Sequence, residues 1–164
     1  MIAGVTADLT TKHYVFRVYL DPTVDYQPVH YWFDGNLGIQ TSTNPGALFG
    51  IGQGMSSLFA GLSAVFLVFI IAWLFFFGGL SSRLLTMALG LVSGGILGNF
   101  YDRIGWGYQA VYPIEIQYNV RDWIYFRLPG VPGFDPWPNF NLADSCLVVG
   151  AALLFVHAIM HRKP

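Results

Sequence analysis

The sequence predicts an all-α membrane protein, a bundle of four transmembrane helices with a small extracytoplasmic β-hairpin or β-cradle region. Hydrophobic residues make up 54% of the 164 residues and charged residues only 10%, whereas a typical soluble domain carries roughly 25% charged residues. One segment, residues 55–77, contains no charge at all. The chain length favours a single domain over residues 1–164.

The first predicted span covers about residues 1–20 and is short or incomplete. Met1–Ala7 is apolar, but Asp8, Lys12 and Arg17 interrupt the segment that follows. A cleaved signal peptide is not expected, because there is no basic start and no long apolar run before a cleavage site.

The first outer segment, residues 21–54, contains a predicted β-hairpin. Two β-prone runs, VHYWF and LGIQTST, flank Asp34-Gly35-Asn36. An Asp-Gly pair between such runs is typical of a tight hairpin turn.

Two apolar spans follow, at residues 55–77 and 84–100. At about 1.5 Å per residue the first is long enough to cross the roughly 30 Å hydrocarbon core. In the second, Gly90, Gly94 and Gly98 recur every fourth residue and share one helix face. Small residues at this spacing allow a neighbouring helix to approach closely, which indicates a bundle.

The second outer segment, residues 101–138, is rich in Trp, Tyr and Pro and leads into the last span, residues 141–160. Aromatic rings of this kind are typical of a membrane surface. Arg83, Arg162 and Lys163 lie in short segments on one side of the bundle. The positive-inside rule therefore predicts cytoplasmic N- and C-termini, with both outer segments on the opposite face.

Several classes of function are excluded by the composition. The net charge of -1 provides no basic field for nucleic acid. Cys146 is the only cysteine, which excludes an intrachain disulfide and CxxC-type zinc sites. The four histidines form no HExxH-type cluster, and we expect neither a metal nor a cofactor.

Polar residues gather at the outward ends of the last two spans, where each requires a partner or a task because polar groups are costly in the membrane. The group comprises Asn99, Asp102, Arg103, Asp122, Asn141 and Asp144.

Structural alternatives exist for these residues. Asn141 and Asp144 have the spacing of a helix N-cap and its acidic N3 partner, Asp102-Arg103 is a candidate local ion pair, and Asp122 is a candidate solvated charge in the loop.

A rival function is a non-enzymatic polytopic membrane protein, a small transporter or an assembly subunit, although such proteins place ionisable groups near the bilayer midplane.

Five segments resemble motifs of the lipoprotein signal peptidases, the type II signal peptidases. In chain order they are DLTTK (8–12), NPGALFG (44–50), GNFYDR (98–103), VRDWI (120–124) and FNLADS (140–145). They follow the order of the family and cover nearly the whole chain.

The resemblance implies a four-helix aspartyl peptidase of the bacterial inner membrane, with its active site near the outer face. It implies removal of the signal peptide from diacylglyceryl-modified prolipoproteins, with cleavage just before the lipidated cysteine. The implied partners are this substrate and membrane lipids, and the implied state is a monomer. The implied roles are catalysis for Asp122 and Asp144, substrate binding for Asn44, Asn99, Arg103 and Asn141, and support for Asp8, Lys12, Gly46 and Asp102.

The sequence departs from the family pattern before Asp8, where the span is shorter, and between Arg103 and Asp122, where the segment is longer. The longer segment leaves Glu115 as a competing first catalytic acid. Asp122 is favoured because its motif is kept. The helix dipole would favour the anion of Asp144, and our hypothesis is that Asp144 is more often ionised and Asp122 more often protonated.

Overall fold

The computed structural model describes residues 1–46, 52–78, 80, 82–107 and 112–161. Three motif or orientation segments therefore lie partly outside the described residues: 47–50 of NPGALFG, 108–111 of the longer segment, and Arg162 with Lys163 at the C-terminus. The elements in chain order are α1 (Ile2–Tyr19), β1 (His30–Phe33), β2 (Leu37–Asn44), α2 (Ser56–Phe76), α3 (Arg83–Arg103), the 3-10 helix η2 (Ile114–Ile116), β3 (Val120–Phe126), β4 (Trp137–Phe140) and α4 (Leu142–Met160).

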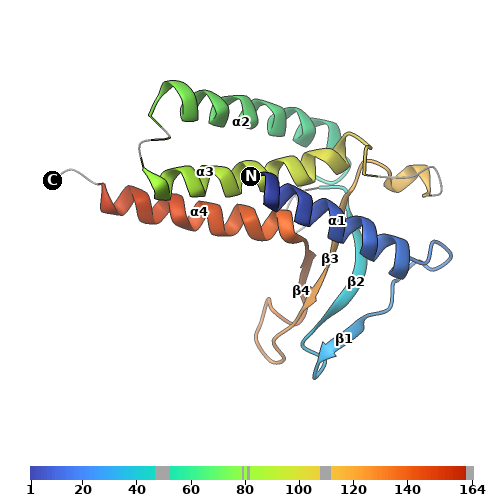
Figure 1. The fold of residues 1–164 in the computed structure, drawn as a ribbon. Coiled ribbons are helices and arrows are strands. Elements are labelled where there is room, and N and C mark those ends of the chain that lie inside the picture. Colours follow the sequence, from blue (N-terminus) through green and yellow to red (C-terminus); the bar gives the residue numbers. More distant parts are fainter. Residues whose placement is uncertain (47–51, 79, 81, 108–111, 162–164) are drawn as a thin grey trace.

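Three helices, α2, α3 and α4, are long and apolar enough to span a membrane within the described part of the chain. They lie alongside one another, and the sheet extends from one end of this bundle (Figure 1). Their bounds agree with the predicted spans to within a few residues, except that α3 continues to Arg103. Asp102 and Arg103 are therefore held by the last helical turn.

Helix α1 lies beside α3 and does not qualify as a span by composition, because it carries Asp8, Lys12 and Arg17. A Cβ added at Gly90 or Gly94 would lie 3.5 or 3.3 Å from the backbone of Met1. Helix α1 thus begins beside the middle of α3 and runs toward the sheet, as Figure 1 shows. The predicted close approach at this glycine face is confirmed, whereas a fourth membrane span stays a prediction.

The sheet has four antiparallel strands in the order β1-β2-β3-β4. The predicted hairpin is confirmed: β1 and β2 are joined by Asp34-Gly35-Asn36, in which Asp34 and Gly35 have φ of 38° and 76°. Positive φ at two successive residues suits Asp-Gly and matches the twist of the strands.

Asp122 was expected in a loop, and this was wrong because it lies on β3, between β2 and β4. Residues on both faces of this strand are buried. A strand covered on both faces lacks the alternation of apolar and polar residues by which a strand is recognised in sequence.

Helix α1 connects the sheet to the bundle. Its residues Val15 and Phe16 form a buried apolar cluster with Ile39 of β2 and Trp123 of β3. One and two turns earlier, respectively, the side chains of Lys12 and Asp8 are fully buried. Helix α1 therefore helps to hold β3 against the bundle.

Candidate functional site

Asp144 is held in the first turn of α4 by a capping box. Its backbone N–H donates to Oδ1 of Asn141 at 2.9 Å, and its Oδ2 accepts from the backbone N–H of Asn141 at 3.1 Å. Its Oδ1 accepts a further hydrogen bond from Nδ2 of Asn99 at 2.8 Å. The capping interpretation is confirmed, and the same geometry orients the carboxylate.

Asp122 lies beside the N-terminus of α4 and is 3% exposed. Nδ2 of Asn141 donates to its Oδ1 at 2.6 Å, and the side chain of Asn44 provides a second hydrogen bond. Asn141 therefore contacts both carboxyl groups, Asp144 through the cap and Asp122 through its amide. The alternative of a solvated loop charge is wrong for Asp122.

The surroundings favour the protonated form of Asp122. Burial raises its pKa well above the usual value, and the neighbouring charge of Asp144 raises it further. Lys12 and the hydrogen bonds from Asn141 and Asn44 act in the opposite direction but are smaller. Two adjacent carboxyl groups, one of which retains its proton, can provide an acid and a base at one place.

A buried ionic cluster centred on Lys12 lies next to this pair. Its Nζ contacts Oδ2 of Asp8 at 2.8 Å and Oδ2 of Asp102 at 3.1 Å, and it donates to Oδ1 of Asn99 at 2.9 Å. Oδ1 of Asp8 in turn accepts from the backbone N–H of Ala143 at 2.9 Å. The cluster connects α1, α3 and the start of α4, and it fixes the amide of Asn99 that contacts Asp144.

Arg121 completes the cluster and was not singled out as a site residue from the sequence. Its Nη2 and Nε lie 2.7 and 2.9 Å from Oδ1 of Asp102, and its backbone N–H donates to Oδ2 at 3.1 Å. The candidate pair Asp102-Arg103 is thus replaced by pairs of Asp102 with Lys12 and Arg121. Its position next to Asp122 is the signal in the sequence that could have indicated this role. Successive strand residues point to opposite faces, so Arg121 faces away from the two carboxyl groups when Asp122 faces them.

Arg103, the last residue of α3, contacts the segment that follows β2. Its Nη2 donates to the carbonyl oxygen of Gly46 at 3.0 Å, and its guanidinium lies 5.3 Å from the ring centre of Phe59. The backbone N–H of Gly46 donates to Oδ1 of Asn44 at 3.0 Å. Arg103 therefore holds the end of β2, and Asn44 with it, next to Asp122.

The structure brings together all ten residues selected from the sequence, through the contacts given above. The side chain of Glu115 lies outside the described part, and its role as a competing acid stays a prediction. Among the described residues, no group of three or more His, Cys, Asp or Glu side chains could hold a metal ion.

Comparison with known proteins shows the family of the chain. The model of a family described as "Signal peptidase (SPase) II" matches residues 1–160. The lipoprotein signal peptidase of Rhodopirellula baltica is 44% identical over 157 residues, which are 96% of this chain and 68% of that protein. The lipoprotein signal peptidase of Symbiobacterium thermophilum is 33% identical over 165 residues, or 99% and 93% of the two chains.

Solved structures share the fold. A bacterial membrane enzyme aligns with a TM-score of 0.75 at 23% identity and covers 99% of this chain and 90% of its own. A second bacterial membrane enzyme aligns with a TM-score of 0.71 at 25% identity and covers 98% and 90%.

Proposed function

The chain belongs to the signal peptidase II family, and we propose that it is an aspartic endopeptidase that removes signal peptides from diacylglyceryl-modified prolipoproteins. The cut falls just before the lipid-modified cysteine. The observation that carries the proposal is that Asn141 contacts both Asp122 and Asp144, which joins two carboxyl groups from β3 and α4 into one unit.

In the proposed mechanism the two carboxyl groups act on a water molecule and on the scissile amide. Asp144, as the carboxylate, takes a proton from the water while the oxygen of the water attacks the carbonyl carbon. Asp122 gives its proton to the amide nitrogen as the C–N bond breaks. The raised pKa of Asp122 supports its assignment as the acid, although the titration belongs to the pair as a whole.

Four residues around the pair, Asn44, Asn99, Arg103 and Asn141, line the proposed substrate site. Asn44, Asn99 and Asn141 already form side-chain hydrogen bonds with the two carboxyl groups. We assign these three residues mainly to orienting the pair, with Asn44 also at the edge of the substrate site, and we assign the main substrate contact to Arg103.

The proposed location is the bacterial inner membrane, with the chain acting as a monomer. The sheet and both carboxyl groups lie at one end of the bundle, while Arg83 begins α3 at the other end. A basic residue at that end supports cytoplasmic termini and an active site near the outer face.

The proposal is tested by expressing the full chain in bacteria that lack their own type II signal peptidase and following prolipoprotein size on a gel. We expect wild type to yield the mature form and Asp122→Asn or Asp144→Asn to leave the precursor uncut. Asp34→Asn is the matched control, because Asp34 is exposed in the hairpin turn and Asn tolerates its positive φ. Normal processing by either of the first two variants would disprove the assigned pair.

A further inference from the structure

A groove lies on the side of α3 that faces α1, separate from the two carboxyl groups. Its volume is about 620 Å³, within the range of roughly 300–1,000 Å³ that is usual for small-molecule sites. It is lined by His13, Arg17, Tyr101, Trp106, Gly107 and Arg121, among others. Neither Asp122 nor Asp144 lines it, since Arg121 and Asp122 are successive residues of β3 and point to opposite faces.

The groove carries excess positive charge. No Asp or Glu is among the described residues that line it. The nearby carboxylate of Asp102 is already paired with both Lys12 and Arg121, so it does not offset the charge of Arg17. Arg17 and His13 are both exposed on α1. The side chains at the opening of the groove therefore favour an anion.

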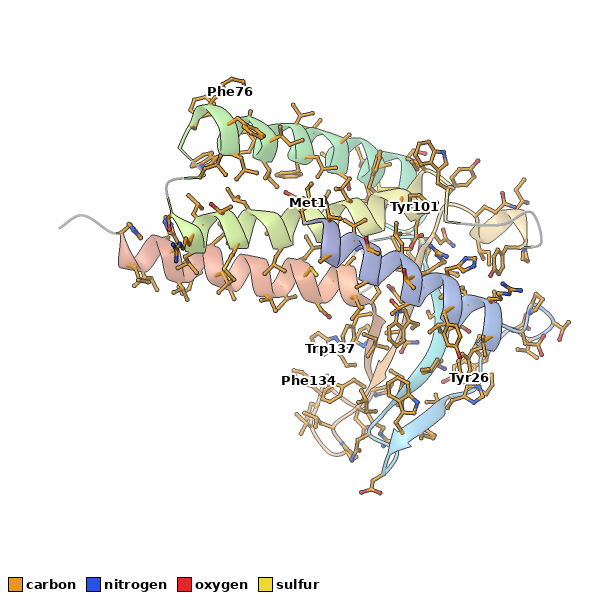
Figure 2. All side chains as sticks on the ribbon, in the orientation of Figure 1. Met1, Tyr26, Phe76, Tyr101, Phe134 and Trp137 are labelled. Atoms are coloured by element: carbon orange, nitrogen blue, oxygen red, sulfur yellow. The ribbon has the colours of Figure 1, made fainter. Side chains whose placement is uncertain are left out.

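The groove also lies at the depth of a membrane surface. Tyr101 is in the last turn of α3, where the apolar helix ends and the sheet begins, and Figure 2 shows it at the α1 side of that end. The ring of Trp106 packs edge-on against Tyr101 at 6.0 Å and is 70% exposed. Exposed aromatic rings at a helix end are typical of the headgroup region of a bilayer.

We propose that this groove binds the headgroup of an anionic phospholipid. The phosphodiester accepts charge-assisted hydrogen bonds from Arg17, whose planar guanidinium suits phosphate oxygens, and His13 adds a donor beside it. Tyr101 and Trp106 contact the glycerol and the start of the acyl chains. A lipid held here joins α1 to the end of α3 from outside, on the side away from the two carboxyl groups.

The experiment measures bound lipid by native mass spectrometry of the full chain in neutral detergent, with phosphatidylglycerol and phosphatidylcholine at equal concentrations. We expect selective retention of phosphatidylglycerol. Arg17→Gln lowers its affinity about fivefold, the effect expected for one basic residue at an anionic membrane surface, and Arg17→Lys keeps most of it. Arg83→Gln is the matched control, because Arg83 is also exposed but begins α3 at its far end.

Trp106→Ala is a second variant that leaves every charge in place, and we expect it to retain less phosphatidylglycerol than wild type. Thermal unfolding in the same detergent shows that each variant is folded. Equal retention of the two lipids, or wild-type affinity in Arg17→Gln, would overturn the proposal. Displacement of the lipid by an equal concentration of inorganic phosphate would assign the groove to free phosphate instead. Bound lipid is measured without any processing reaction, so failure here is distinct from failure of the proposed function.

Discussion

Replacing Lys12 with methionine should destabilise the protein strongly, because Lys12 neutralises a fully buried cluster. The cluster holds two carboxylates, Asp8 and Asp102, and two cations, Lys12 and Arg121, so its charges balance. Methionine fills a similar volume but leaves one buried negative charge unmatched. Asp102 keeps its ion pair with Arg121, so the unmatched charge is mainly that of Asp8. Among the described residues, the carboxylate of Asp8 then retains only the hydrogen bond from the backbone N–H of Ala143.

Removing one partner from a buried ion pair typically costs about 3–5 kcal/mol. The lower end applies here, because a chain unfolded within a membrane or micelle finds other polar partners. About 3 kcal/mol corresponds to a folded-to-unfolded ratio roughly 150-fold lower. The assay is reversible unfolding of the purified protein in mixed micelles, followed by circular dichroism.

The double variant Asp8→Asn with Lys12→Met supplies the control, because it restores the charge balance. We expect it to be at least about 1 kcal/mol more stable than Lys12→Met alone, within the usual range of coupling between contacting residues. The reasoning fails if Lys12→Met unfolds at the same denaturant concentration as wild type. It also fails if the added Asp8→Asn change restores nothing.

The remaining predictions concern the site and the glycine face. Gly98→Ala should lower the free energy of unfolding by about 1–3 kcal/mol through overpacking, because the new Cβ would meet the buried carboxylate of Asp8 in α1. Gly61→Ala in α2 is its control, because a Cβ there has no neighbour within 4 Å. It should change the free energy of unfolding by less than about 1 kcal/mol in the same assay. Activity that uses the proton of Asp122 should fall as pH rises through its raised pKa, which a pH–rate profile of processing would reveal as an alkaline limb. Asn141→Ser keeps a good N-cap and should cost about 1 kcal/mol for the lost amide hydrogen bond. Because that hydrogen bond lowers the pKa of Asp122, its loss should move the alkaline limb to higher pH, and an unmoved limb would argue against Asp122 as the acid.

The sequence was informative where one local pattern has one physical meaning. A charge-free run such as 55–77 is long enough to cross a bilayer, and α2 occupies it. Asn141 followed by Asp144 three residues later predicts a capped helix, and α4 begins there. Asp34-Gly35 predicts the hairpin turn by its need for positive φ, and β1 and β2 flank it.

Where residues distant in the chain meet, the sequence was less informative. Strand β3 was interpreted as part of a loop, because burial on both faces removed its alternation. Asp102 was considered a partner of its neighbour Arg103, but the last turn of α3 and the position of α1 bring Lys12 and Arg121 to it instead. Such pairing depends on the packing of α1 between sheet and bundle, which is not a local property.

By itself the sequence determined that this is a membrane protein of the signal peptidase II family and which carboxyl groups to consider. The length of an apolar run, a helix cap and a short motif each depend on residues that are close in the sequence, so they can be recognised without knowing the fold. Only the tertiary structure decided that Asn141 contacts both Asp122 and Asp144, and that a neutral buried cluster supports them. It also decided that Asp122 is buried beside another acid, and both features raise the pKa of Asp122.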